Sequence, residues 1–282
     1  MTWRGKSSYD EPFTWWGPTW ASPVSRSISD LILEGTLTPV AAGLLWTLMA
    51  RRASILVTAG PSGAGKTTLL TALLDFLPTG TRRIYVRGCY EPFHFLTDAA
   101  IEPQRTALLV NEISPHLPSY LWGPGVRRLL NAKDNGFLLA ATAHATSVED
   151  LVGSLSGYPL RVPPAEIAAF DLVVLLDAWE ERGKVRREVA EVVALTPVGG
   201  GGGVQVDRLL RREGRGVDGA PDVPADTPVL IRFRLGAESF KREVAERADA
   251  LAGLAAKGVM GPEGLATLQA LGEWWLPGDG SG

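Results

Sequence analysis

The sequence has one cysteine and little net charge, and each of these restricts what the protein can be. Cys89 has no second cysteine to pair with, so no disulfide can form within the chain, which fits a reducing cytoplasm. The formal net charge of −3 argues against wholesale nucleic-acid binding, which usually needs a basic face, although a local basic groove is compatible with it. With 45% hydrophobic and 21% charged residues, the composition is that of an ordinary globular protein.

Long hydrophobic runs are also absent from the sequence. The longest apolar run lies near residues 40–50 and stops at Arg51 and Arg52, well short of the roughly 20 residues that cross a bilayer. The first six residues lead into polar and proline-containing sequence and not into an apolar signal core. We therefore expect a cytoplasmic protein without direct membrane insertion. If it works at the inner face of the cell membrane, it docks there through a partner.

Residues 60–68 have the G-x-x-x-x-G-K-[ST] spacing of a phosphate-binding loop. The stretch before it, 54–59, is apolar and partly β-branched, which predicts a buried parallel strand. The stretch after it, 67–77, predicts a helix that ends at Pro78. This strand–loop–helix order is the context that the motif requires. The residues predicted to bind the phosphates are Gly60, Pro61, Ser62, Gly63, Ala64, Gly65, Lys66, Thr67 and Thr68.

Each part of this loop has a physical task. Glycines at 60, 63 and 65 let the backbone turn its N–H groups inward without a Cβ in the way. The helix that begins near Lys66 offers unpaired N–H donors and a partial positive charge. We expect Lys66 to lie along the β- and γ-phosphates, and the Thr67 hydroxyl to bind a magnesium ion shared with them. The predicted cofactors are therefore ATP and Mg²⁺.

Three further residues stand where apolar strands end in polar sequence. Glu112 follows the apolar run 107–110 and is predicted to hold the magnesium ion or its water shell. His144 ends the run 138–144, beside the expected γ-phosphate, whose presence it could report. Glu91 follows another strand and could orient or deprotonate the attacking water, although it could also be a loop carboxylate before a proline.

The order of these segments predicts an α/β fold. Strands alternating with helices indicate a mostly parallel, doubly wound sheet whose sites lie at the carboxyl ends of its strands. The predicted strands are 54–59, 83–87, 106–111, 137–142 and 171–176. The expected parts of the chain are an N-terminal arm with short helices (1–52), a P-loop ATPase core (53–180), a β-rich extension with a glycine-rich loop (181–235) and a helical tail (236–282).

Several local features refine this outline. Thr38 and Pro39 are expected to begin a helix. A β-hairpin is expected around residues 180–183, and residues 199–203 are either a glycine linker or a long hairpin tip. The run 229–234 predicts a further strand. The tail is expected to bury one apolar helix face and to place the charged pair Glu243/Arg247 on the other, with a last helix from residue 262.

These motifs resemble those of the ATPases of type II and type IV secretion and of pilus assembly, nearest to the Flp (tight adherence) pilus branch. The resemblance covers about residues 28–210, and its segments are the lead-in 30–37, the Walker A motif 60–70, the Walker B motif 109–113, the histidine box 141–150 and the strand pair 170–193. It implies a RecA-like core and a homo-oligomeric ring of six. It also implies ATP hydrolysis that drives pilin extraction or secretion, and an inner-membrane platform protein as partner.

The family resemblance also assigns the general base, and the sequence departs from the family near it. The second glutamate of the family's acidic box falls on Glu91, but Arg87 and Gly88 replace the usual Glu-Asp of that box. Asn111 replaces the usual glycine before the Walker B glutamate. Ser114 and Pro115 replace the usual arginine and aspartate. The family's large N-terminal domain has little counterpart here.

Two other functions remain compatible with the sequence. The altered acidic box would suit an ATP-binding regulator or ring component that hydrolyses little. The arginine-rich stretch 208–215 would suit a nucleic-acid motor, although a solvated face is the plainer interpretation. Arginine fingers are expected from another subunit, and no motif chooses among the candidates Arg26, Arg51, Arg52 and Arg161.

Overall fold

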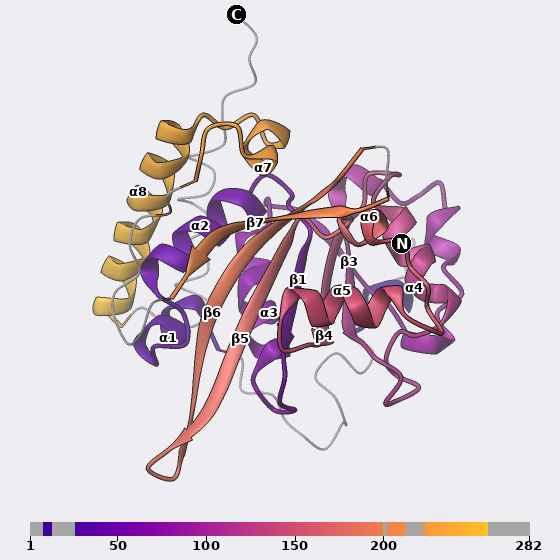
Figure 1. The fold of residues 1–282 in the computed structure, drawn as a ribbon, viewed down its shortest axis with the longest axis horizontal. Coiled ribbons are helices and arrows are strands. Elements are labelled where there is room, and N and C mark those ends of the chain that lie inside the picture. The colour runs from indigo at the N-terminus through magenta and orange to yellow at the C-terminus, as the bar shows by residue number, and fades with distance from the viewer. Residues whose placement is uncertain (1–7, 13–25, 200–201, 213–220, 222, 259–282) are drawn as a thin grey trace, which may run out of the picture.

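The computed structural model describes residues 8–12, 26–199, 202–212, 221 and 223–258, and all structural statements concern these residues. A seven-stranded sheet in the order β2-β3-β4-β1-β5-β6-β7 forms the centre (Figure 1). The first five strands in this order run parallel, and β6 and β7 are antiparallel to their neighbours. The strands are β1 Ile55–Ala59, β2 Arg82–Tyr85, β3 Thr106–Ile113, β4 Leu138–His144, β5 Leu172–Glu181, β6 Lys184–Pro197 and β7 Val204–Arg211.

Helices cover both faces of this sheet (Figure 1). They are α1 Ile28–Leu33, α2 Pro39–Met49, α3 Lys66–Leu73, α4 Pro124–Ala132, α5 Val148–Ser156, α6 Pro164–Ile167, α7 Pro228–Arg232 and α8 Ala237–Ala256. Short 3₁₀ turns occur at Ser8–Asp10, Leu74–Phe76, Gly88–Tyr90, His94–Leu96 and Pro103–Arg105. The predicted α/β fold with a mostly parallel sheet is confirmed. The position of β4 between β1 and β3 is consistent with the predicted RecA-like core.

Two apolar cores lie on the two faces of the sheet. Successive side chains of a strand point to opposite faces, so Ile55 and Val57 of β1 pack with α2, α3 and α8. Leu56 of the same strand packs on the other face with α4, α5 and α6. All five residues of β1 are buried. Strand β1 is therefore buried on both faces, as the mostly apolar, partly β-branched stretch 54–59 predicts.

The turn chemistry that the sequence predicts is present at several ends of elements. The Thr38 side chain accepts a hydrogen bond from the backbone N–H of Ala41 at 3.1 Å, and Pro39 opens α2. The predicted hairpin joins β5 to β6 through Arg182 and Gly183, both at positive φ, and it projects from the body of the molecule (Figure 1). In the second hairpin the N–H of Val198 donates to the carbonyl of Gly203 at 3.0 Å, so the described residues join β6 to β7 as a hairpin, while residues 200–201 of the glycine-rich segment lie outside them.

The run 229–234 was predicted to be a strand, and this prediction is wrong. The segment forms the short helix α7, with Pro228 at its first position. Proline fixes φ near the helical value and lacks the N–H that a first helical residue leaves unpaired. Val229 and Leu230 are buried while Ile231 is exposed. A short apolar run cannot by itself distinguish a strand from a buried helical turn, and here the proline decides.

The helical tail has the predicted apolar face, but one charged residue, Arg247, does not lie on the predicted outer face. Phe240, Val244, Ala248 and Leu251 of α8 are buried, as expected. Arg247 was predicted on the outer face, but it is only 3% exposed, and its guanidinium lies 5.3 Å from the ring centroid of Trp46. Burial lowers the pKa of Arg247 to about 10. The helix predicted from residue 262 lies outside the described residues, as does most of the arm 1–24.

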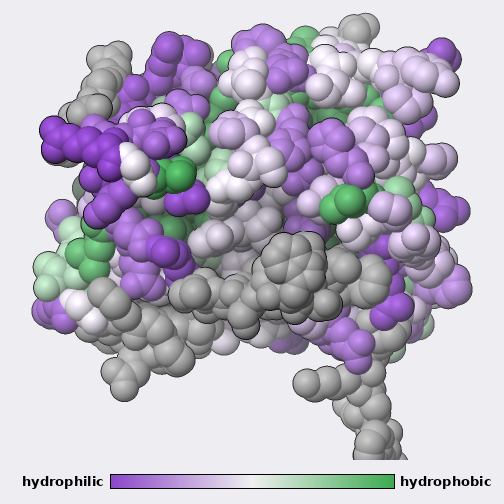
Figure 2. All heavy atoms as spheres, turned by 90° about the horizontal axis from the view of Figure 1, so that it is seen from below, coloured by the Kyte–Doolittle hydropathy of each residue, from purple (hydrophilic) through white to green (hydrophobic). Residues whose placement is uncertain are grey.

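Among the described helices, none combines enough length and apolar character to cross a bilayer. The face toward which the β5–β6 hairpin projects is mostly hydrophilic where described residues form it, with apolar residues in small separate patches (Figure 2).

The crossing of α2 and α8 gives the first prediction. A Cβ on Gly43 would lie 2.5 Å from the carbonyl oxygen of Val244. Helix propensity alone favours alanine over glycine by about 1 kcal/mol, but this backbone clash forces the helices apart. We expect Gly43→Ala to lower the free energy of unfolding by roughly 1–2 kcal/mol in urea denaturation. The matched control is Gly153→Ala in α5, where no described atom lies within 4 Å, and it should stabilise. Equal effects of the two substitutions would contradict this packing.

Candidate functional site

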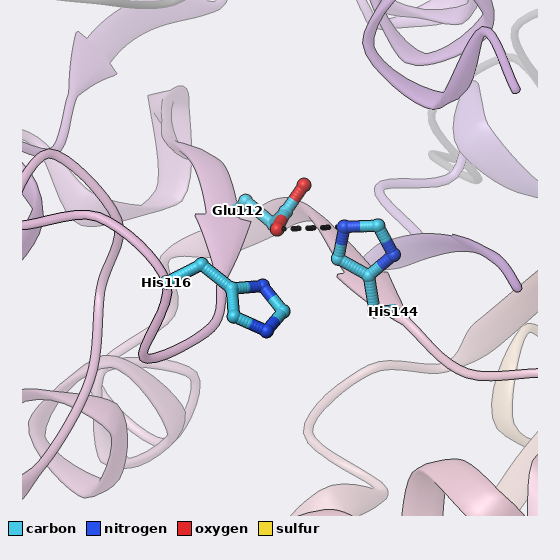
Figure 3. A group of neighbouring side chains, drawn as sticks. All are labelled: Glu112, His116 and His144. Atoms are coloured by element: carbon cyan, nitrogen blue, oxygen red, sulfur yellow. Dashed lines mark ion pairs between the residues drawn. The ribbon is translucent and has the colours of Figure 1, made fainter. Parts of the chain in front are cut away.

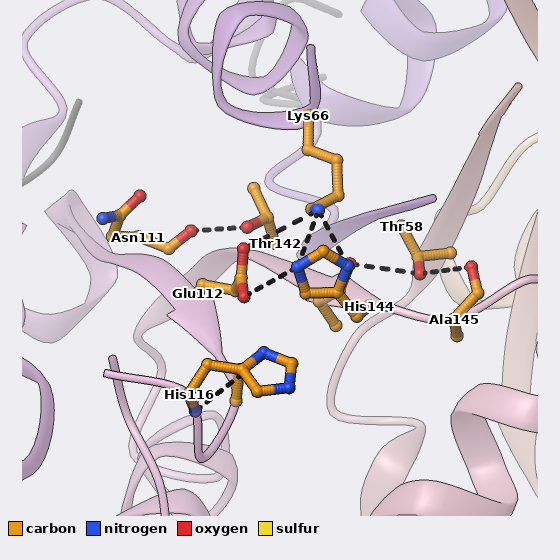
Figure 4. Close-up of polar contacts among 10 residues, drawn as sticks. Thr58, Lys66, Asn111, Glu112, His116, Thr142, His144 and Ala145 are labelled. Atoms are coloured by element: carbon orange, nitrogen blue, oxygen red, sulfur yellow. Dashed lines mark hydrogen bonds and ion pairs between the residues drawn. The ribbon is translucent and has the colours of Figure 1, made fainter. Parts of the chain in front are cut away.

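Lys66, Glu112 and His144 meet at the carboxyl-end edge of the sheet (Figure 4). The Lys66 Nζ lies 3.7 Å from Glu112 Oε2, and 3.3 and 3.4 Å from the two ring nitrogens of His144. His144 Nε2 lies 3.1 Å from Glu112 Oε1. Lys66 lies at the start of α3, which follows β1, and Glu112 and His144 lie at the ends of β3 and β4. The three residues meet because β4 lies between β1 and β3 in the sheet. The structure thus brings together three of the residues that the sequence singles out.

The cluster is largely removed from water. The side chains of Lys66, Glu112 and His144 are 6%, 9% and 25% exposed. Burial lowers the pKa of Lys66, and the nearby charge of Glu112 opposes this effect without cancelling it. The buried ammonium is therefore incompletely compensated. An anionic group entering beside it would stabilise its charged form.

The backbone before α3 has the shape that a phosphate cradle requires. Gly63 and Gly65 have φ values of +75° and +94°, which residues with a Cβ rarely adopt. Gly65 is the N-cap of α3, and within the described residues it has no side-chain cap, so the first N–H groups of the helix are free of side-chain partners. Thr67 lies in this first turn and is half-buried. The loop therefore presents backbone donors and the Lys66 ammonium to the same place.

The residues also fit a magnesium ion. Glu112 Oε1 is buried and, apart from its contact with His144, accepts no hydrogen bond from the described residues. An unsatisfied carboxylate oxygen is costly to bury, and it is the type of ligand that Mg²⁺ or its bound water prefers. The Thr67 hydroxyl is the second oxygen ligand that the sequence predicts. These two residues would hold the ion beside the phosphates.

Buried hydroxyl groups fix the strand ends around the cluster (Figure 4). The Thr142 hydroxyl donates to the carbonyl of Asn111 at 2.5 Å, which ties β4 to β3 next to Glu112. The Thr58 hydroxyl lies 3.3 and 3.0 Å from the carbonyls of Ala143 and Ala145 on either side of His144. These hydrogen bonds hold the glutamate and the histidine at fixed heights on neighbouring strands.

The segment after His144 packs on the phosphate loop. The N–H of Thr146 donates to the Asp150 carboxylate at 2.8 Å, and Ser147 caps α5 by accepting from the N–H of Asp150 at 3.1 Å. A Cβ placed on Gly60 would lie only 2.7 Å from Cγ2 of Thr146. Glycine is therefore required at position 60 for close approach of the two segments.

Glu91, predicted to act on the attacking water, is held by its own loop. Its Oε2 accepts from the N–H of Arg87 at 3.0 Å and its Oε1 from the N–H of Phe93 at 2.8 Å. In the described part of the chain no hydrogen bond or ion pair joins it to the cluster of Lys66, Glu112 and His144. Its role as a base remains a prediction.

Arg187 of β6 covers the phosphate loop, and no motif predicts this contact. Its Nη2 donates to the carbonyl of Gly63 at 3.2 Å, and its Nε is buried without a hydrogen-bond partner in the described structure. It borders a cavity of about 270 Å³ on the flank of the loop. The described lining residues are Arg26, Leu31, Glu34, Thr36, Gly63, Gly65, Thr68, Leu69 and Arg187, so the cavity lies beside the loop and apart from Glu112 and His144.

His116 is a second residue that sequence reasoning missed. Its ring lies 5.6 Å from that of His144, and Figure 3 shows both imidazoles beside the Glu112 carboxylate. The Ser114 hydroxyl lies 2.8 Å from His116 Nδ1. Ser114 was noted only as a departure from the family pattern. A histidine two residues later gives no motif, and only the turn after β3 places it at the site.

The four arginines considered as fingers differ in their surroundings. Arg51 pairs with Glu243 at 2.9 Å, and Arg52 donates to the carbonyl of Gly136 at 3.1 Å, so both brace the fold. Arg161 lies over the ring of Tyr158. Arg26 pairs with Glu34 and borders the cavity beside the phosphate loop.

Comparisons with known proteins give a limited result. No protein-family model and no curated protein matches the sequence. One similar solved structure is the VirB11 ATPase of the Brucella suis type IV secretion system in complex with sulphate, with a TM-score of 0.38 and 21% identity over 62% of this chain and 64% of that one. Another is the Legionella pneumophila ATPase DotB, with a TM-score of 0.35 and 17% identity over 52% and 47%. The chain spans less than two thirds of either, and the function proposed below rests on the residues of the site.

The contact between Gly60 and Thr146 gives the second prediction. We expect Gly60→Ala to lower the free energy of unfolding by about 1 kcal/mol, because its Cβ would overlap Cγ2 of Thr146. Thr146→Ser removes this methyl and keeps the hydroxyl that bonds to Asp150. In a double-mutant cycle the second substitution should restore most of the loss. Simple additivity of the two effects would show that these segments do not touch.

Proposed function

We propose that this chain binds ATP with Mg²⁺ and hydrolyses it, as an ATPase of the secretion and pilus-assembly type. The observation that supports this most directly is the position of the Lys66 ammonium 3.7 Å from the buried Glu112 carboxylate, at the mouth of a glycine loop. A cation and a metal-binding carboxylate so close together suit a phosphate–magnesium pair, because Lys66 can face the anionic phosphate and Glu112 the magnesium cation.

The side chains divide the work along the triphosphate. Lys66 and the N–H groups at the start of α3 bind the β- and γ-phosphates, and Thr67 and Glu112 hold the magnesium ion. The bound ion would supply positive charge to the oxygens that become more negative as the γ-phosphate leaves. His144 lies 3.3 Å from Lys66 and would respond when the γ-phosphate draws that ammonium toward itself. Glu91 would accept a proton from the attacking water, after its loop moves toward the site.

The cavity beside the phosphate loop would take the nucleoside. It borders Gly63, Gly65 and Thr68 of the loop and helix start, whereas Glu112 and His144 are not among its described lining residues. A triphosphate that lies along the loop therefore has its γ end at Glu112 and its nucleoside end at the cavity. The volume of about 270 Å³ is near the lower end for small-molecule sites, which begin at roughly 300 Å³.

The biological role that we propose is protein secretion or pilus assembly, and the main support for it is the histidine box. This segment, 141–150, is the most family-specific part of the sequence resemblance. Its histidine lies beside Lys66 and its Thr146 packs on the phosphate loop. We include in the proposal a homo-oligomeric ring, hexameric by resemblance, and a platform protein of the inner membrane as partner. The tight-adherence branch stays part of the proposal.

One observation favours a second candidate, an ATP-binding regulator that hydrolyses little. Both oxygens of Glu91 accept backbone hydrogen bonds within a loop that lacks the usual acidic residues. A nucleic-acid motor is less favoured. Arg208 pairs with Glu191, and Arg212 pairs with Glu188 at 3.0 Å, so the charge of the arginine-rich stretch is partly neutralised within the chain.

The third prediction separates binding from hydrolysis. Lys66→Ala should weaken ATP binding at least about tenfold, which corresponds to ~1.4 kcal/mol, because it removes the charge on the phosphates. Glu112→Gln should keep ATP binding and lower kcat by roughly 10²-fold or more. Equilibrium binding of a fluorescent ATP analogue and steady-state phosphate release measure the two effects. Glu91→Gln decides between enzyme and regulator: an unchanged, near-background rate in parent and variant supports the regulator.

The fourth prediction concerns the nucleoside end. Arg187→Gln should weaken ATP binding by roughly tenfold and leave the binding of inorganic tripolyphosphate nearly unchanged. The matched control is Arg186→Gln, one residue earlier in β6, where the side chain is exposed and pairs with Glu181. Competition against a fluorescent ATP analogue measures both ligands. An equal loss for tripolyphosphate would contradict the placement of the nucleoside in this cavity.

A further inference from the structure

The side chains around Glu112 contain more metal ligands than a magnesium–ATP site needs. Glu112, His116 and His144 each offer one ligand atom, and these three atoms lie within 4.8 Å of one another. Figure 3 shows the two imidazoles beside the carboxylate. Two of the three histidines of the whole chain are thus gathered at one carboxylate.

This ligand set suits a different kind of ion from magnesium. Mg²⁺ prefers oxygen ligands and keeps several waters, whereas imidazole nitrogen is a ligand for zinc and related transition metals. Two histidines and one carboxylate, with a fourth position open, form a set that is common in zinc sites. His116 therefore adds nothing to magnesium binding, but it completes a set of three for a zinc-class ion.

The geometry is partly formed already. In a tetrahedral site with bonds of about 2.0–2.1 Å, neighbouring ligand atoms lie about 3.3 Å apart. His144 Nε2 and Glu112 Oε1 are 3.1 Å apart, close to this spacing. His116 is exposed, and its ring needs to approach by about 1.5 Å to reach the same spacing. Side-chain rotation of an exposed residue can provide this movement.

A neighbouring residue orients the exposed imidazole. The buried Ser114 hydroxyl lies 2.8 Å from His116 Nδ1, and it also accepts from the N–H of His116 at 3.2 Å. When Nδ1–H donates to a fixed oxygen, Nε2 carries the lone pair that a metal binds. Metal-binding histidines in proteins usually have such a partner on their other nitrogen.

We propose that Glu112, His116 and His144 bind a zinc-class transition-metal ion, and that this ion inhibits ATP turnover. The inhibition rests on the proposed function, because the ion would occupy the glutamate that serves magnesium. Lys66 opposes the ion, since its ammonium is 3.7 Å from Glu112 and about as close to His144. The positive charge of Lys66 therefore lowers the affinity for the metal ion, and a bound metal ion in turn disfavours the charged form of Lys66.

The first test measures metal binding to the nucleotide-free full-length protein. Zn²⁺ is titrated against a chromophoric chelator, so that no nucleotide competes for the ion. His116→Ala should weaken binding at least tenfold, and Lys66→Ala should strengthen it severalfold. The matched control is His94→Ala, the one remaining histidine of the chain, which lies outside the cluster and should bind as the parent does. Equal affinity of the parent and His116→Ala overturns the proposal, and so does an equal loss in His94→Ala.

The second test measures regulation. Phosphate release is followed at fixed free Mg²⁺ with increasing free Zn²⁺. The parent protein should be inhibited, whereas His116→Ala should need at least tenfold more Zn²⁺ for the same fractional loss of its own zinc-free rate. Equal inhibition of both proteins overturns the regulatory half of the proposal. If the protein hydrolyses no ATP at all, the proposed function fails while the chelator titration still decides the metal site.

Discussion

The site depends on one electrostatic constraint, the burial of the Lys66 ammonium beside the Glu112 carboxylate. A charge taken out of water is costly unless an opposite charge or a hydrogen-bond acceptor lies next to it. Glu112 is one such partner, but burial still lowers the pKa of Lys66. The protein thus holds a cation that one carboxylate does not fully satisfy. The glycine loop and the start of α3, which has no side-chain cap among the described residues, add partial positive charge at the same place. An anion bound there would compensate both the helix start and the Lys66 ammonium.

The topology of the sheet makes this arrangement possible. Parallel strands end at one edge, so the residues that follow β1, β3 and β4 are necessarily neighbours. With β4 between the other two, His144 stands between Lys66 and Glu112 and contacts both. The hydroxyls of Thr58 and Thr142 then fix this strand against its neighbours. In the proposed function, a change at the nucleotide would act first on His144, and through the contact of Thr146 with Gly60 on the start of α5.

The sequence predicts those parts of the site that local spacing specifies. Lys66 follows from the loop motif, and Glu112 and His144 follow from apolar runs that end in polar residues. Arg187 and His116 could not be found in this way, because Arg187 reaches Gly63 of the loop from 124 residues later and His116 is placed by the turn after β3. The two wrong predictions about the fold have different causes. The helix at 228–232 had a local signal in Pro228, whereas the burial of Arg247 depends on the ring of Trp46, which is distant in the sequence.

The departures from the family pattern acquire a physical meaning when they are considered together. Where the family has arginine and aspartate after the Walker B glutamate, this chain has Ser114, Pro115 and then His116, which replaces a charged pair by a hydroxyl and an imidazole. An arginine near Glu112 would repel any second cation, whereas an imidazole can share one. Glu112 carries a single negative charge and has Lys66, magnesium and a softer metal as possible partners. Because one carboxylate cannot compensate all three, occupancy by one cation would lower the affinity for the others.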